Sequence, residues 1–421
     1  MIPEADQRRN GLVFAIITAL GYLVAPVFYV GVLHAAILES LGASDTLANL
    51  PGAVYLWVTP VPVLVAWWFP SPSLLRPLLT HSLLVKGGGG ILVALVLAAA
   101  PRAWWIPALV LHAGLIGIAG GIGNMCVWEL LGRGLSAERR AGVLGWTFGL
   151  GPIFAVLGSC ASQLVLTGTF QDWIHIAAVP KPWCYVLLFG ATGPAMWVSA
   201  ALVRVARVPP APEPEAGVRW DVIREGVRQY FQHPLIRFAV VAFLLTYGGT
   251  MIMGNLSLYA RTAIGDAPEQ YAGLQLALRF GFKCIAGFAL AWLLARVSGR
   301  ASLVATTATC LAGVAWALAV PGKWYLLSFG LLGAGELFYV YYVNFIIGCS
   351  PPARIRENTA YTNLLTAGLG FVPLGFGLVS DRFGIPASLS VALAMFLVAI
   401  AVVLARLPRV PAMDGSARSN P

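Results

Sequence analysis

Long apolar stretches separated by short polar segments run along the whole chain. Each stretch is close to the roughly 20 residues that cross the hydrocarbon of a bilayer as a helix. Backbone polar groups in lipid must be satisfied within the segment, so runs of this length predict helices. The twelve stretches are 12–35, 46–69, 80–100, 104–131, 141–167, 183–204, 236–260, 271–295, 301–320, 324–348, 358–380 and 385–406. The predicted fold class is therefore an all-α integral membrane protein.

Composition supports a membrane protein. Apolar residues make up 59% of the chain and charged residues 10%, against about 25% charged residues in soluble domains. Residues 1–10 lead directly into the first apolar stretch, so we expect no cleaved signal peptide. The six cysteines form neither a close pair nor a metal-binding spacing, and we expect them to pack as small apolar residues.

The positive charges predict the orientation in the membrane. Twelve spans place both termini on one side, and that side carries 20 of the 27 Lys and Arg residues. The opposite side carries 5, and the last 2 lie inside a span. Because Lys and Arg accumulate in cytosolic loops, both termini are predicted to be cytosolic. The net charge of +10 follows mostly from this topology and does not indicate nucleic-acid binding.

A polar segment in the middle divides the chain into two halves of six helices. We predict a six-helix half at 1–204, a cytosolic linker at 205–235, a second six-helix half at 236–410 and a flexible tail at 411–421. The linker begins Pro-rich and continues with apolar residues at helical spacing from Trp220 to Phe231, which predicts an amphipathic helix. This helix is either a strap between the halves or a partner-binding surface.

Three charged residues lie inside two of the predicted spans. Arg279 and Lys283 are four residues apart in 271–295, so both side chains leave the same face of the helix. Glu336 lies near the centre of 324–348. At 1.5 Å per residue, Lys283 and Glu336 both lie about 18 Å from the end at which their helices enter, and Arg279 about 12 Å. We predict that Glu336 pairs with Lys283 or Arg279 at mid-membrane.

These charges have two interpretations. A buried charge is costly unless it is paired or hydrated, so the three residues form either a static clamp or a site that rearranges during transport. Two cations against one acid favour a substrate with an anionic group, which Arg279 can bind through two parallel hydrogen bonds. Glu336 can alternatively take up a proton, so that proton and substrate would compete for one network.

Other polar and aromatic residues inside the spans are candidates for the substrate or coupling site. Each of the tyrosines has a competing role as a packed ring or interface anchor. Tyr339 and Asn344 share roughly one helix face with Glu336. The remaining candidates are Tyr29, Asn124, Tyr247, Asn255, Gln275 and Asn363.

Two further charges lie in spans three and four. Lys86 begins the run Lys86-Gly-Gly-Gly-Gly, and we expect its ammonium to extend to the cytosolic interface. Glu129 lies near the cytosolic end of span four and is expected to pair with Arg133, four residues on, or with a nearby arginine.

With six plus six spans and a central linker, the chain resembles the major facilitator superfamily over nearly its whole length. The loop motif G-x-x-x-D-R-x-G appears as Gly377, Asp381, Arg382 and Gly384 after span eleven. After span eight only Gly299 and Arg300 of that motif remain, with Arg296 at the acid position. Gly151 and Pro152 in span five resemble the family's antiporter motif. The resemblance implies a gating or structural role for these residues and for Glu129 and Arg133.

The resemblance implies a secondary transporter that works by alternating access, with the substrate bound at mid-membrane between the halves. We expect a small organic solute, with an organic anion favoured, proton coupling, and a monomer in a bacterial inner membrane. Neither a cofactor nor a metal is predicted. The alternatives are a facilitator-fold transceptor, a structural membrane protein or a membrane-embedded enzyme. An enzyme would need clustered catalytic groups, but the five His are scattered, and no GxxxxGK[ST] loop for ATP occurs.

Overall fold

The computed structural model describes residues 3–69, 71–170, 174–209, 220–350 and 355–411. Parts of the predicted linker (210–219) and nearly all of the predicted tail (412–421) lie outside these residues. The first half contains α1 (Glu4–Leu23), α2 (Ala25–Phe28), α3 (Leu33–Ser40), α4 (Asp45–Trp57), α5 (Val61–Trp68), α6 (Leu75–Ala99), α7 (Trp105–Gly134), α8 (Ala137–Thr167) and α9 (Trp183–Val203). A short antiparallel hairpin, β1 (Thr169–Phe170) and β2 (Ile174–His175), connects α8 to α9.

The second half follows α10 (Trp220–Gln232), the helix predicted in the linker. The Tyr230 hydroxyl of α10 lies 2.6 Å from that of Thr362 in the second half, so α10 is anchored there as a strap would be. The helices of this half are α11 (Pro234–Thr250), α12 (Met253–Leu258), α13 (Ala260–Ala263), α14 (Ala272–Arg296), α15 (Gly299–Ala319), α16 (Leu327–Gly335), α17 (Phe338–Gly348), α18 (Ile355–Leu365), α19 (Phe371–Phe383) and α20 (Ile385–Arg406).

Short 3-10 turns complete the described elements. They precede or interrupt the long helices and lie at η1 (Pro72–Leu74), η2 (Arg102–Trp104), η3 (Pro268–Tyr271), η4 (Gly322–Leu326) and η6 (Thr366–Gly370).

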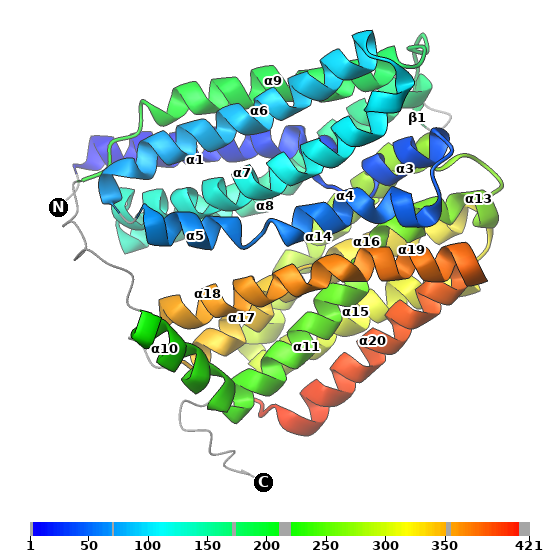
Figure 1. Ribbon diagram of the computed structural model, residues 1–421. Helices are drawn as coiled ribbons and strands as arrows, with labels where there is room; N and C mark the ends of the chain where they lie inside the picture. Colours follow the sequence, from blue (N-terminus) through cyan, green and yellow to red (C-terminus); the bar gives the residue numbers. More distant parts are fainter. Residues whose placement is uncertain (1–2, 70, 171–173, 210–219, 351–354, 412–421) are drawn as a thin grey trace.

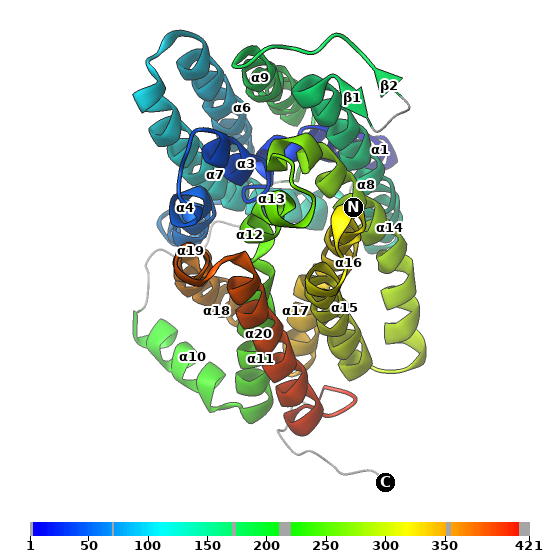
Figure 2. The same ribbon diagram turned by 90° about the vertical axis from the view of Figure 1, so that its right-hand side faces the viewer.

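The two halves lie side by side with their helices roughly along one direction (Figure 1). We call the end with the N-terminus and α10 the terminus face, and the end with β1 and α13 the far face. Seen from the far face, α4 lies beside α19, and α3 lies beside α12 (Figure 2). Toward the terminus face the ribbons of α5 and α18 are set apart (Figure 1).

In the described chain, eleven helical segments are long and apolar enough to cross a membrane. The remaining predicted span, 12–35, is covered by α1, α2 and α3, which are interrupted at Val24 and again at Tyr29–Val32. Gly31 adopts a φ of 132° in the second interruption, a conformation that residues with a side chain rarely adopt. Span one is therefore a broken helix, and the predicted set of twelve spans is accounted for.

Other spans are broken near their middle, which the sequence analysis did not predict. Span two is interrupted at Val58–Pro60, span seven between α11 and α12, and span ten at Glu336–Leu337. In span eleven the 3-10 turn η6 separates α18 from α19. Irregular backbone at membrane depth is tolerated only inside protein or next to water, so these breaks indicate the interior of the bundle.

Candidate functional site

The predicted pairing of Glu336 is confirmed, and the glutamate contacts both cations. Arg279 Nη2 donates to Glu336 Oε1, and Lys283 Nζ donates to Glu336 Oε2 over 3.4 Å. The side chains of Arg279 and Glu336 are 10% and 11% exposed, and that of Lys283 is 19% exposed. We call these three residues the charge cluster. It holds two cations and one acid, so it keeps one positive charge in excess.

Small residues in span ten bring Glu336 to Arg279. A Cβ built on Gly333 would lie only 2.2 Å from the carbonyl oxygen of Arg279, so only glycine allows α16 to approach α14 here. On another side, a Cβ on Gly335 would meet Cys310 of α15 at 2.3 Å. Glu336 follows directly, at the break between α16 and α17. The charge cluster thus depends on close contact between helices eight and ten.

Replacing Gly333 with alanine should disrupt the charge cluster. The added methyl group meets backbone rather than a flexible side chain, so the two helices must separate. Overpacking of this kind costs about 1–3 kcal/mol. We expect a lower melting temperature in detergent than for Gly281→Ala, where a Cβ meets no atom within 4 Å. Equal melting temperatures for the two variants would contradict this packing.

Tyr29 covers the charge cluster from the other half. Its ring centroid lies 4.7 Å from the Arg279 guanidinium carbon and 6.0 Å from Lys283 Nζ, within the range of cation–π attraction. The same ring packs edge-to-face on Phe280, with a centroid distance of 4.9 Å. Tyr29 follows α2 in the broken part of span one. The site is therefore built from both halves at the level of the helix breaks.

Three more tyrosines gather around this level. Tyr247 lies within electrostatic range of Tyr29, Tyr55, Tyr339 and Glu336. We call Tyr29, Tyr55, Tyr247 and Tyr339 the tyrosine group; two come from each half. The Tyr339 hydroxyl donates to Asn363 Oδ1 over 2.6 Å, which places Asn363 beside the group. The sequence analysis did not name Tyr55 as a candidate. The only feature that could have indicated it is its position as a tyrosine near the middle of span two.

The other predicted candidates lie elsewhere. Gln275 is fully buried in the second half, where it accepts from Ser257 and lies 3.3 Å from the Tyr325 hydroxyl. Asn124 and Asn344 are exposed. Asn255 is fully buried near the far face. The structure thus groups Tyr29, Tyr247, Tyr339 and Asn363 with the charge cluster, but not these four polar residues.

The expectation for Lys86 was wrong. Its ammonium does not extend to the terminus face but lies 5.6 Å from the ring centroid of Phe28, at the break in span one. A Cβ built on Gly120 would lie 3.8 Å from Lys86 Nζ. Gly120 is fourteen residues before the end of α7, or about 21 Å from the terminus face. A Cβ at Gly120 would reach only ordinary van der Waals contact with the lysine, so the glycine marks where the Lys86 side chain passes α7.

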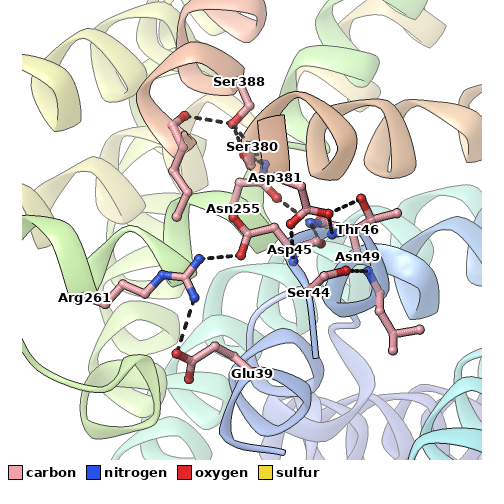
Figure 3. A network of polar contacts seen from close by, with 12 residues as sticks. Glu39, Ser44, Asp45, Thr46, Asn49, Asn255, Arg261, Ser380, Asp381 and Ser388 are labelled. Carbon is pink, nitrogen blue, oxygen red and sulfur yellow. Dashed lines mark hydrogen bonds and ion pairs between the residues drawn. The ribbon is translucent and has the colours of Figure 1, made fainter. Parts of the chain in front are cut away.

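At the far face, the two halves are joined by a polar network that we call the far-face latch (Figure 3). Asp381 lies at the end of span eleven and caps the first turn of α4. Its Oδ1 accepts from Asp45 N at 2.8 Å, and its Oδ2 accepts from Thr46 N at 3.1 Å and from the Thr46 hydroxyl at 2.5 Å. A carboxylate at a helix N-terminus satisfies free backbone N–H groups and complements the helix dipole.

The latch continues through a cation and two amides. Arg261 pairs with Asp45 and with Glu39, whose Oε1 lies 3.4 Å from Arg261 Nη1. Asn255 accepts from Asn49 and lies within 3.0 Å of acceptors on Phe376, Ser380 and Ser388. Asn255, predicted as a substrate residue, is thus part of the far-face latch in this conformation (Figure 3).

Replacing Asn255 with leucine should destabilise the protein. The change removes one hydrogen bond each from Asn49, Ser380 and Ser388, which keep their bonds with Asp45, with each other and with Ile385. A lost hydrogen bond of this kind costs about 0.5–1.5 kcal/mol. We expect a clear fall in melting temperature, against little change for the same substitution at exposed Asn344. If both variants have the melting temperature of the wild type, Asn255 does not hold the latch together.

The latch explains the motif after span eleven. A Cβ on Gly377 would lie 2.5 Å from Thr46 Cα, so glycine allows α19 to touch the start of α4. Gly384 adopts a φ of 83° and ends α19. Arg382 is exposed and packs on the ring of Phe383. In this copy of the motif, the glycine and the acid contact the other half, whereas the arginine makes no hydrogen bond or ion pair with it among the described residues.

Two more contacts join the halves near the far face. Glu269 in the second half is buried and pairs with Lys181 and the Tyr185 hydroxyl of the first half. Gln163 of α8 accepts from Gly273 N at 2.8 Å and donates to the Gln270 carbonyl. With the latch, these contacts fix the two halves together at the far face.

Each of the remaining gating candidates makes its contacts within its own half and not between the halves. Arg133 Nη1 donates to Glu129 at 2.6 Å, which confirms that predicted pair, and Arg133 also donates to the carbonyls of Pro72 and Pro209. Gly151, beside Pro152 in α8, leaves room for the ring of Tyr22 in span one. Gly299 begins α15, and Arg300 donates to the carbonyl of Leu407 at 3.1 Å.

Comparison with solved structures supports the fold. The D-xylose–proton symporter matches with a TM-score of 0.66 at 15% identity, over 98% of this chain and 98% of that chain. The nucleoside transporter NupG matches with a TM-score of 0.65 at 12% identity, over 94% and 98%. A bacterial homologue of the human lysosomal transporter Spinster, in an inward-facing and unoccupied conformation, matches with a TM-score of 0.65 at 13% identity, over 96% and 97%.

No protein-family model and no curated protein matches the chain. The likeness to the solved transporters extends over almost the full length of both partners, and it confirms the predicted major facilitator fold.

Proposed function

We propose that this protein is a secondary carrier that moves a small organic solute across a membrane by alternating access. The observation that carries the proposal is the charge cluster at mid-depth, covered by Tyr29 of the opposite half. A site shared by two halves changes when the halves rock, which is what transport requires. Similar folds serve as a D-xylose–proton symporter and as a nucleoside transporter.

The solute we favour is an organic anion coupled to protons. The excess positive charge of the cluster attracts an anion, and Arg279 can offer it two donors once Glu336 is displaced. Glu336 would then take up a proton, which couples the two movements. Tyr29, Tyr247, Tyr339 and Asn363 would contact the solute from both halves.

The conformation described here would be the one open to the cytosol. The latch closes the far face, and the Lys and Arg distribution supports a cytosolic terminus face. We expect the membrane to be a bacterial inner membrane. Opening the far face would break the cap between Asp381 and α4. The bonds of Asn255 with Asn49 would break with it. We expect the carrier to act as a monomer.

A screen of ligands on the purified protein tests this function. Thermal stabilisation would be measured with organic acids, phosphorylated metabolites, sugars and cationic drugs, for the wild type and for Arg279→Gln. We expect stabilisation by anions that is lost in the variant, followed by uptake of the same anions into proteoliposomes. Stabilisation by neutral or cationic ligands that survives Arg279→Gln would contradict the anion site. Binding without uptake would contradict the carrier.

A further inference from the structure

A third cation, Lys86, lies on the other side of the break in span one. Lys86 of α6 has no ion pair or hydrogen bond among the described residues. Its ammonium makes a cation–π contact with the ring of Phe28. Twelve residues into α6, it lies about 16 Å from the start of that helix. A cation–π contact offsets only part of the cost of an unpaired ammonium at membrane depth, so this group needs water or an anion.

Lys86 and the charge cluster lie against neighbouring residues of span one. The lysine passes Gly120, where a Cβ would lie 3.6 Å from its Cε, and ends at Phe28. The next residue, Tyr29, covers Arg279. Phe28 and Tyr29 therefore separate Lys86 in the first half from Arg279 in the second. Lys86 as a whole residue is half-buried.

The charged groups on the two sides of the break in span one carry more positive than negative charge. Glu336 pairs with Arg279 and Lys283, and Lys86 lies on Phe28, so these four groups together carry two positive charges in excess around the break in span one. The hydroxyls of Tyr29, Tyr55 and Tyr247 have no hydrogen-bond partner among the described residues and can serve as neutral donors.

We propose that the site takes a solute with two negative charges, one held by Lys86 and the other by Arg279 and Lys283. Two carboxylates or one phosphate group have this charge, and each would bridge the two halves. The inference rests on the proposed carrier function and adds the class of solute. Lys86 becomes a binding residue of the first half, matched to the charge cluster of the second.

Charge-selective labelling tests the role of Lys86 without a known substrate. A cysteine is introduced by Gly120→Cys, beside the ammonium, in the wild-type and the Lys86→Gln backgrounds. Anionic and cationic methanethiosulfonates of equal size are applied, and modification of residue 120 is followed by mass spectrometry, so the native cysteines can stay. With Lys86 present we expect the anionic reagent to react about tenfold faster than the cationic one. Lys86→Gln should remove most of this preference.

Either of two results would overturn the proposal: no modification by either reagent, which would mean that the ammonium is sealed off, or a preference unchanged by Lys86→Gln. The matched control is Lys323→Gln, which removes a lysine that is exposed at the far face and should leave the preference intact.

A ligand series separates this proposal from the proposed function. Thermal stabilisation by succinate, inorganic phosphate and butyrate is compared in the wild type, Lys86→Gln and Arg279→Gln. We expect the dianions to stabilise the wild type more than butyrate does, and Lys86→Gln to remove that difference while butyrate stays unchanged. Equal effects of Lys86→Gln on all three would refute the dianion site alone. Stabilisation by none of the anions in the wild type would refute both the dianion site and the anion carrier.

Discussion

Glu336→Gln should lower the melting temperature of the purified protein more than removal of any other single acid. The change leaves Arg279 and Lys283 side by side in the membrane interior without their shared counter-charge. Breaking a buried ion pair by removal of one partner costs about 3–5 kcal/mol. The measurement is thermal unfolding in detergent micelles at fixed protein concentration.

Two further variants identify the cause. Glu129→Gln removes an acid from a more exposed pair with Arg133, whose side chains are 39% and 22% exposed, and should cost no more than about 1 kcal/mol. Arg279→Gln combined with Glu336→Gln should recover part of the loss, because contacting residues do not act additively. If Glu336→Gln has the melting temperature of the wild type, the charge cluster does not hold helices eight and ten together.

Asp381→Ala should shift the protein toward a conformation open at the far face. The variant removes the cap on α4 and the negative charge at its N-terminus. A lost cap costs about 0.5–2 kcal/mol, which changes the ratio of the two conformations roughly two- to thirtyfold. Spin labels at Arg102 and Phe383, exposed in different halves on the far face, should show a larger population at long distance.

Arg382→Ala is the matched control for the latch. Arg382 is the neighbour of Asp381 in the same motif, but it packs on Phe383 and makes no hydrogen bond or ion pair with the other half among the described residues. Its distance distribution should match that of the wild type. A shift of equal size in both variants, or in neither, would contradict the role assigned to Asp381.

The ion pair could be predicted from sequence because helices have a regular rise. Counting residues from the helix ends placed Lys283 and Glu336 at one depth, and Glu336 contacts both cations in the structure. The close approach that makes this possible depends on Gly333. That contact is specific to the packing of α14 on α16, and no periodicity reveals it.

Where the structure differs from the sequence predictions, the reason is the rotation of a helix or the identity of the helices packed against it. Asn255 and Tyr247 are eight residues apart in span seven, but α11 ends between them, and Asn255 faces the latch. Lys86 has a stem long enough to extend to the interface, yet it passes α7 at Gly120 and its ammonium lies on the ring of Phe28. The motif acid Asp381 was visible in the sequence, while its partner, the free N-terminus of α4, depends on which helices meet across the halves.

The most direct test of alternating access is a pair of distance distributions measured by pulsed electron resonance in nanodiscs. One pair of labels, at Arg102 and Phe383, spans the far face, and another, at Trp68 and Arg296, spans the terminus face; all four residues are exposed. The account predicts that ligand or pH lengthens the far-face distance and shortens the terminus-face distance in the same fraction of molecules. Distances that stay fixed at both faces, or that change at one face alone, would contradict it.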